Sequence, residues 1–361
     1  EDESSSDSIV LGLNDCRNLC ADAPGLVRAL VATGLGTGLA TKKLLNSNDT
    51  ERCAPPDVLR RLVENMPTEE ECRKVAESAA KTPDAKFNKA TAFVVAAHAF
   101  GLARFKACLN GAATCGEAPS ELEACVEAAQ TASQACRLAR EEPMLRAACH
   151  AALALGNRLN QGSRRGSAVA VRLVDLEKLS QTKGKGGKTA MDYLARVLED
   201  DAFDREEGLD GAEIDRALRV IAPKLKAGAE NAIAEKTLEV KQREMNALNA
   251  LDAFVKSVPK KKKTVDDEAV AAFVRNVPEA SKATRDALHE AKKALDEMNQ
   301  EQKLLREYVG DAAMQIPEIL ESIASFSSKL VSSRTALMKE LGSSSRRSSC
   351  TEVPSRQSSA A

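Results

Sequence analysis

LGNRLNQGSRRGSAVAVRLVDLEKLSQTKGKGGKTAMDYL, the stretch from Leu155 to Leu194, is the most informative part of this sequence. Its first part crowds small and amide residues between two amphipathic helical patterns: Gly156, Asn157, Asn160, Gly162 and Gly166. Small residues let two backbones approach closely, and amides cap helix ends. Leucines at helical spacing then lead to a loop that contains Lys183. The pattern predicts a tight junction between helices.

Composition favours a protein built from helices. Aromatic residues make up 3% of the 361 residues and Trp is absent. Ala, Leu, Glu, Lys and Arg dominate instead, and these are strong helix formers. Stretches such as Thr91–Val95 are too short and too isolated to build a sheet. We expect an all-α fold.

Charge and hydropathy exclude several classes of protein. Lys and Arg total 52 against 53 Asp and Glu, so bulk charge gives no support for a nucleic-acid partner. The apolar runs are far shorter than the ~18 residues of a transmembrane segment. The acidic, Ser-rich residues 1–8 do not form a signal peptide. We therefore expect a cytoplasmic protein.

The cysteines are expected to be free thiols. There are ten of them, and several lie among alanines and leucines on helical patterns: Cys108, Cys125, Cys136 and Cys149. In such surroundings Cys usually acts as a small apolar side chain. Without a secretory signal, a disulfide framework is the less favoured alternative.

Two long helical patterns dominate the second half of the chain. They cover roughly Pro223–Val258 and Glu268–Tyr308, and Pro259 with Lys260–Lys263 joins them into a helical hairpin. Prolines elsewhere are expected where one helix stops or another starts, as at Pro143. At 1.5 Å per residue these helices would be roughly 50–60 Å long, which predicts an elongated module. The second pattern carries an apolar stripe at Ala280, Ala283, Ala287, Ala291, Leu295, Met298 and Leu305.

The sequence contains no complete motif for catalysis or cofactor binding. Gly184–Thr189 suggests a phosphate loop, but Thr182 occupies the position where the first glycine is needed. The three histidines, His98, His150 and His289, have no ligand partner at metal-binding spacing. We expect no metal, no cofactor and no enzyme activity.

The Leu155–Leu194 stretch resembles the signature of formin homology 2 domains, G-N-x-[ML]-N-x-G-[ST]-x-R-G, followed by leucines and D-T-K. The sequence departs from that signature at Ala170-Val171, where the family usually has Gly-Phe, and at Gln181, where it usually has Asp. The matching positions are Gly156, Asn157, Leu159, Asn160, Gln161, Gly162, Ser163, Arg165, Gly166, Ala168, Leu173, Leu176, Leu179, Thr182, Lys183 and Lys188.

The resemblance extends to both sides of the signature. Leu59–Glu71, Ala135–Leu138 and Tyr308–Asp311 are similar to further elements of the family. The resemblance implies one domain over residues 9–341, between an acidic lead-in at 1–8 and a disordered Ser/Arg-rich tail at 342–361. Within that domain it implies a rod with three parts. These are a knob at about 9–115, a post at about 116–222, and a long helical hairpin with closing helices at about 223–341.

The family resemblance also implies a function. Formin homology 2 domains bind actin and act in filament nucleation and elongation at the barbed end, so we expect a cytoplasmic protein of the cytoskeleton. By that likeness Ile9, Lys183 and Arg165 would contact actin. The post residues Gly156, Asn157, Asn160 and Gly162 would receive the lasso segment of a second protomer.

The partners follow from the same resemblance. In the family a lasso that bears tryptophans precedes the domain and makes the homodimer, and this sequence contains no Trp. We therefore expect a homodimer only if a lasso lies upstream, and profilin as an indirect partner through any upstream proline-rich segment. The alternative is a helical scaffold with a degenerate formin domain that no longer nucleates actin. The basic residues before Ser349 mark it as a possible phosphorylation site.

Overall fold

The chain is built from helices connected by loops. The computed structural model describes residues 22–33, 35, 54–81, 87–163, 166–184, 186–198, 211–232, 234–259, 264–310 and 314–348, and no strand occurs in these ranges. The predicted all-α fold is confirmed. The helices are α2 (Ala23–Thr33), α4 (Pro56–Glu64), α5 (Glu69–Lys81), α6 (Lys89–Phe100), α7 (Leu102–Glu141), α8 (Pro143–Leu159), α9 (Leu173–Lys178), α10 (Ala190–Val197), α12 (Gly211–Asn231), α13 (Ala234–Ser257), α14 (Val265–Val309) and α15 (Ile316–Ser348).

The chain folds into two compact units. The first comprises Glu1–Val126 with Glu235–Lys293, and the second comprises Glu127–Ala234 with Ala294–Ala361. The long helices α7 and α14 contribute residues to both units.

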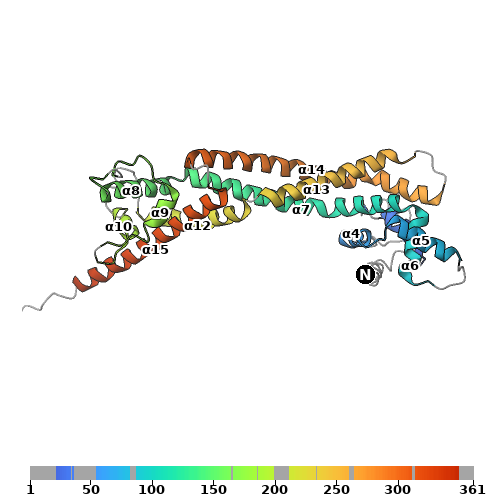
Figure 1. The fold of residues 1–361 in the computed structure, drawn as a ribbon, viewed down its shortest axis with the longest axis horizontal. Helices are drawn as coiled ribbons and strands as arrows, with labels where there is room; N and C mark the ends of the chain where they lie inside the picture. The colour runs from blue at the N-terminus through green and yellow to red at the C-terminus, as the bar shows by residue number, and fades with distance from the viewer. Residues whose placement is uncertain are drawn as a thin grey trace, which may run out of the picture. The chain divides into compact units, whose positions relative to one another are not determined.

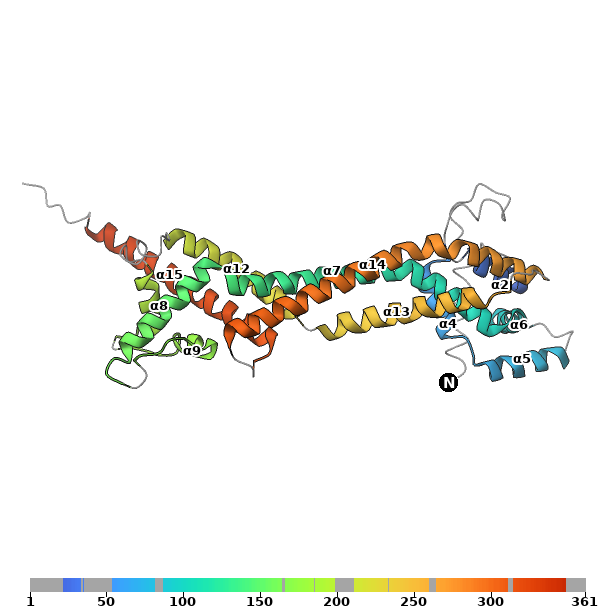
Figure 2. The ribbon, with the colours of Figure 1, turned by 90° about the horizontal axis from the view of Figure 1, so that it is seen from above.

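Aromatic packing organises the first unit. The helix α6 packs against α2 and α5. Its Phe93 and Phe100 rings meet Phe105 of α7 edge to face, at centroid distances of 5.8 and 6.2 Å. In the same unit α13 runs beside α7 and α14 (Figures 1 and 2). There Phe254 and Phe273 join α13 to α14 at 6.4 Å.

Buried ion pairs fix helices in the second unit. The helix α15 packs against α12, α10 and α9. Its Arg334 is fully buried, and Nε lies 2.7 Å from a carboxylate oxygen of Asp215 on α12. Glu301 of α14 is nearly buried and accepts hydrogen bonds from Arg137 and Arg140 of α7. Removing one partner of such a pair would leave a buried charge, so these contacts define a specific packing arrangement.

The prolines behave differently from the sequence prediction at three positions. Pro143 lies in the first turn of α8, as expected, but Pro119, Pro223 and Pro278 lie inside α7, α12 and α14. A proline inside a helix removes one backbone hydrogen bond. Burial of the neighbouring turns holds the helix together, since Ala118 beside Pro119 is fully buried. Tertiary packing therefore overrides the local helix-breaking signal.

The predicted single helix Pro223–Val258 is in fact two helices, α12 and α13. The break follows Asn231, whose side chain donates to the backbone oxygen of Ala227 at 2.8 Å. Gln302 of α14 donates its side-chain amide to the backbone oxygen of Ala232 at 3.2 Å. The break is thus stabilised by a side chain distant in sequence, which a local pattern cannot reveal.

The apolar stripe predicted between Ala280 and Leu305 of α14 is fully buried only in its second half. Ala291 and Leu295 are buried, as are Met298 and Leu305, but Ala283 is exposed. The buried positions in that turn are the polar Ser281 and Thr284. An apolar pattern cannot identify buried hydroxyl residues, and this shifted the predicted face.

The C-terminal helix runs further than predicted. The polar tail was expected from Gly342, but α15 continues to Ser348. No proline interrupts this part of the sequence, and Arg and Ser are tolerated in helices.

The thiols in the described residues are free, as predicted. Cys108, Cys125 and Cys136 are buried and Cys149 is half-buried. Burial raises the pKa of Cys108 and of Cys136 to about 12. These side chains are therefore packing residues at neutral pH.

Across the described ranges no single helix is both long and apolar enough to cross a membrane. The pair α6 and α7, which is bent by 101°, meets that criterion only jointly.

We predict opposite effects for two helical glycines. A Cβ at Gly228 of α12 would overlap the Cβ of Ala135 on α7, whereas a Cβ at Gly156 of α8 would meet nothing within 4 Å. Gly228→Ala should lower the free energy of unfolding by about 1–3 kcal/mol because the contact is overpacked. Gly156→Ala is the matched control and should raise it by roughly 0.5–1 kcal/mol. Urea unfolding followed by circular dichroism measures both, and a stabilised Gly228→Ala would contradict the packing.

Candidate functional site

The signature residues gather around one hollow in the second unit. This signature groove has a volume of about 880 Å³ and is bordered by the end of α8 with Asn160, the segment 168–172, α9 and the start of α10. Among the predicted site residues, those that line it are Gly156, Asn157, Asn160 and Lys183. The groove therefore brings together residues that lie up to 27 positions apart in the sequence.

Asn157 fastens the segment after α8 back onto that helix. Its Nδ2 donates to the backbone oxygen of Ala168, and its Oδ1 accepts from the backbone N–H of Ala168, both at 2.9 Å. The side-chain amide thus mimics a backbone partner in a two-bond pair. We call this pair the Asn157 clamp, and it holds the segment that forms one wall of the groove.

Asn160 ends α8 and begins the turn beneath the clamp. Its side chain donates to the backbone oxygen of Gly156 at 2.8 Å. Its backbone oxygen accepts from the N–H of Ser163 at 3.0 Å. A Cβ at Gly166 would lie 2.5 Å from that same oxygen, so only glycine fits there. Gly162 has φ +83°, in the left-handed region that favours glycine.

The surroundings of Gly156 differ from those expected from the sequence. We expected the small residues of the signature to permit close approach of backbones. Gly166 does so, but Gly156 lines the groove and has open space where its Cβ would be. Gly156 therefore leaves the surface of α8 uncovered towards the groove.

The loop with Lys183 forms another part of the border. The N–H of Gly184 donates to the backbone oxygen of Lys188, and that of Ala190 donates to Thr182, each at 2.8 Å. Gly186 and Gly187 turn the chain between these bonds with φ of +101° and +80°. The loop therefore holds the exposed Lys183 at the groove on a backbone fixed at both sides.

A capping box starts α10 at the end of this loop. The side chain of Thr189 accepts from the N–H of Asp192, and the Asp192 carboxylate accepts from the N–H of Thr189 at 2.8 Å. Burial opposes ionisation of Asp192, but hydrogen bonds from Thr189 and Ser333 together with the charge of Lys188 outweigh it, so the pKa of that carboxyl lies below its ordinary value. The cap fixes where α10, and with it Tyr193, meets the groove.

The groove combines positive charge with exposed apolar surface. Its lining contains Arg172, Lys178 and Lys183 but one carboxylate, Asp175. Hydrogen bonds from Lys178 and Arg172 lower the pKa of Asp175. Leu159 and Tyr193 line the same groove and are 61% and 41% exposed. This chemistry suits an acidic partner segment that carries apolar side chains.

The groove residues that sequence reasoning missed include Arg172, Lys178 and Tyr193. The spacing of Arg172, Asp175 and Lys178 was an available signal, because residues three apart on a helix are neighbours. Tyr193 gave no such signal, since only the fold brings it to the groove.

Several predicted positions fall outside the described residues. These are Ile9, Arg165, Ser349 and the run Lys260–Lys263. In the part of the chain that the structure describes, no group of His, Cys, Asp and Glu side chains is arranged to hold a metal ion.

The fold and the groove define a class of protein: an all-helical module with a basic and partly apolar groove on its second unit. The family model of the formin homology 2 domain matches residues 40–331. The chain therefore belongs to the formin homology 2 family.

Curated relatives agree with this assignment over shorter stretches. Formin-like protein 16 of Arabidopsis thaliana is 45% identical over 73 residues, which is 20% of this chain and 10% of the relative. Formin-like protein 3 of Oryza sativa subsp. japonica is 45% identical over 69 residues, or 19% of this chain and 6% of the relative. Formin-like protein 6 of the same species is 57% identical over 47 residues, which is 13% of this chain and 3% of the relative. The aligned stretches thus span a tenth or less of these relatives.

We predict that Asn157→Ala frees the wall of the groove. The substitution removes both bonds of the clamp, so the amide of Ala168 should lose its protection against hydrogen exchange. Hydrogen exchange with mass spectrometry measures this. Arg158→Ala is the matched control, because it removes the neighbouring bond from Arg158 to Gln161 and leaves the clamp intact. Unchanged exchange at Ala168 in Asn157→Ala would contradict the role of the clamp.

Proposed function

We propose that this chain binds actin and acts in filament nucleation and elongation at the barbed end. The observation that carries the proposal is the family match over residues 40–331, which includes the groove formed by the signature residues. Its action is recognition of protein surfaces and not covalent catalysis. The cytoplasmic cytoskeleton is the location that this activity requires.

In this proposal the groove is the lasso-receiving part of a post. Gly156, Asn157, Asn160 and Gly162 would receive the segment of a second protomer. The open space at Gly156 and the exposed side chain of Leu159 support this role, because an apolar segment would cover both. A homodimer requires a lasso upstream of residue 1, and profilin would join through an upstream proline-rich segment. The knob, post and hairpin boundaries drawn from the resemblance belong to the same proposal.

The actin contacts of the proposal are Ile9, Arg165 and Lys183. Lys183 is exposed and stands on a loop fixed by main-chain hydrogen bonds, which suits a salt-sensitive contact with acidic residues of actin. Full burial of an isoleucine side chain such as that of Ile9 contributes roughly 1.5–3 kcal/mol, enough for about a tenfold effect on affinity.

One observation favours the second candidate, a helical scaffold that no longer nucleates actin. Ala170 and Val171 line the groove at the positions where the signature usually has Gly-Phe. Val171 has a smaller side chain than the usual phenylalanine, so the shape of the groove differs from the one that a standard lasso would fill. Actin that assembles equally fast with and without the chain, with the chain monomeric by light scattering, would support the scaffold.

Lys183→Asp should slow actin assembly, most strongly at low ionic strength, because it reverses a charge that faces the partner. The fluorescence of labelled actin follows assembly over time. Lys224→Asp, at an exposed position of α12 away from the groove lining, should leave the curve unchanged. Identical curves for Lys183→Asp and the unmodified chain at low salt would remove this contact from the proposal.

Ile9→Ala should weaken binding to filaments about tenfold or more, because it removes most of the apolar side chain that the proposal buries. Cosedimentation with filaments measures the affinity, and circular dichroism checks that the helices persist. Ser6→Ala, three residues earlier in the same segment, serves as the control. Equal sedimentation of Ile9→Ala and Ser6→Ala would eliminate Ile9 as the anchor.

A further inference from the structure

An exposed serine lies in the segment that forms one wall of the signature groove. Ser167 is part of the turn that follows the Asn160 turn, and residues 168–170 after it are exposed as well. Val169 is the extreme case, with 97% of its surface exposed. The segment therefore presents its side chains to solvent and not to the core.

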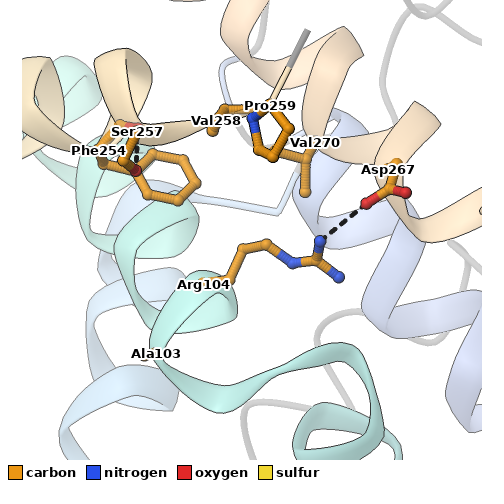
Figure 3. Close-up of a pocket in the computed structure, with 8 residues that line it drawn as sticks. All are labelled: Ala103, Arg104, Phe254, Ser257, Val258, Pro259, Asp267 and Val270. Carbon is orange, nitrogen blue, oxygen red and sulfur yellow. Dashed lines mark hydrogen bonds and ion pairs between the residues drawn. The ribbon is translucent and has the colours of Figure 1, made fainter. Parts of the chain in front are cut away.

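The hydroxyl of Ser167 is available to a reacting group. It makes no hydrogen bond to another residue that the structure describes. Ser257 of α13 is also exposed, but its hydroxyl donates to the backbone oxygen of Phe254 at 2.7 Å (Figure 3). Ser163 likewise donates to the backbone oxygen of Asn160 at 2.7 Å. Such a bond must break before the serine oxygen can react, and Ser167 has none to break.

The residues before Ser167 form a charge pattern that suits a protein kinase. The sequence of residues 164–167 is RRGS, with arginines three and two positions before the serine. A kinase binds its substrate as an extended segment and selects it by complementary charge, so recognition follows from the order of residues along the chain. The same pattern precedes Ser349, whereas Phe254 and Val255 occupy these positions before Ser257.

The Asn157 clamp restrains the backbone just after Ser167 and leaves the serine side chain uncovered. It engages the N–H and the backbone oxygen of Ala168, both at 2.9 Å. These bonds lie at an exposed position, where water replaces a broken hydrogen bond at little net cost. The turn can therefore open locally and extend into the active site of a kinase.

A phosphate on Ser167 would alter the charge of the signature groove. The groove lining carries three cations, Arg172, Lys178 and Lys183, and one carboxylate, Asp175. A phosphoserine carries about −1.5 to −2 charges at neutral pH. Since Ala168 lines the groove, a phosphate on the residue before it would stand at the edge of the groove. It would cancel most of the surplus positive charge.

We propose that Ser167 is a phosphorylation site for a serine kinase that recognises basic residues, and that its phosphate cancels the positive charge of the signature groove. In the reaction Ser167 Oγ bonds to the γ-phosphorus of ATP, and the bond from that phosphorus to the bridging oxygen of ADP breaks. The hydroxyl proton passes to an aspartate of the kinase. The effect on partners rests on the proposed function, since an acidic partner would then be attracted less.

The catalytic subunit of cyclic-AMP-dependent protein kinase, which recognises basic residues, tests the site on the full chain with ATP. Mass spectrometry should find Ser167 phosphorylated and Ser257 unmodified. Arg164→Ala should lower the rate at Ser167 about tenfold or more, because it removes one of the two charges that the kinase reads. Arg158→Ala, at an exposed position of α8 outside the pattern, is the matched control and should leave the rate unchanged.

Two results of this experiment would overturn the proposal. One is a Ser167 that stays unmodified in the full chain. If the peptide GSRRGSAVA, residues 162–170, is phosphorylated under the same conditions, the fold shields the serine. The other is an equal rate for Arg164→Ala and Arg158→Ala. Actin is absent from the experiment, so failure of the proposed function would leave its outcome unchanged.

Tyrosine fluorescence tests the charge of the groove, again without actin. The chain has no Trp and two tyrosines, so Tyr308→Phe leaves Tyr193 of the groove lining as the only tyrosine. Phosphorylation should lower the quenching of Tyr193 by iodide about 1.5-fold at about 0.1 M salt, the effect of about two charges about 10 Å away. Quenching by neutral acrylamide should stay the same.

The matched control is Ser167→Ala in the same Tyr308→Phe chain, treated with the kinase. It keeps Ser349 and its two arginines, so it separates the effect of a phosphate on Ser167 from that of one on the tail. Its iodide quenching should not change on treatment. Unchanged iodide quenching in a chain that is fully phosphorylated at Ser167 would overturn the proposal.

Discussion

The two hydrogen bonds between the Asn157 side chain and the backbone of Ala168 are the constraint on which the groove depends. They join the last part of α8 to a residue eleven positions later, which restricts the described turns at Asn160 and Gly166. Within those turns Asn160 ends the helix, and Gly166 is required because its backbone passes against the Asn160 oxygen. The same two hydrogen bonds hold the start of the wall that contains Ala170 and Val171.

The Asn157 clamp forms only one wall of the groove. The remaining walls come from α9, α10 and the loop before α10, which are positioned by packing against other helices. The Thr189–Asp192 box starts α10 at a defined residue, and α15 holds α10 through contacts along its length. Lys188, at the end of the basic loop, lies 2.5 Å from Glu340 of α15. Exposed ion pairs of this kind contribute little to stability, but they orient a loop that the backbone bonds already restrict. Contacts within the chain therefore hold the described walls of the groove, and a site held in this way loses less entropy on binding than a flexible one.

The sequence predicted the helical class and the helix junction at residues 156–166 for physical reasons, whereas the roles of the signature residues came only from the family resemblance and stay predictions. Few aromatic residues and many alanines favour helices over sheets, and the amides and glycines between 156 and 166 predict a junction between helices. The failures have a different origin. The exposure of Ala283 follows from buried Ser281 and Thr284, and the break after Asn231 is stabilised by Gln302 from another helix. Tyr193 reaches the groove only through tertiary contacts. Local patterns carry no information on such long-range partners.

The signature groove combines apolar side chains with Arg172, Lys178 and Lys183, yet the overall charge of the chain is near zero. Local charge, and not net charge, is what acidic partners meet. Our central proposal is that this chain acts on actin filaments at the barbed end. Microscopy of single filaments tests it most directly, by measuring the growth of each filament end with and without the chain. Our account predicts an altered rate at the barbed end and an unaltered rate at the pointed end, whereas unchanged growth at both ends would contradict it.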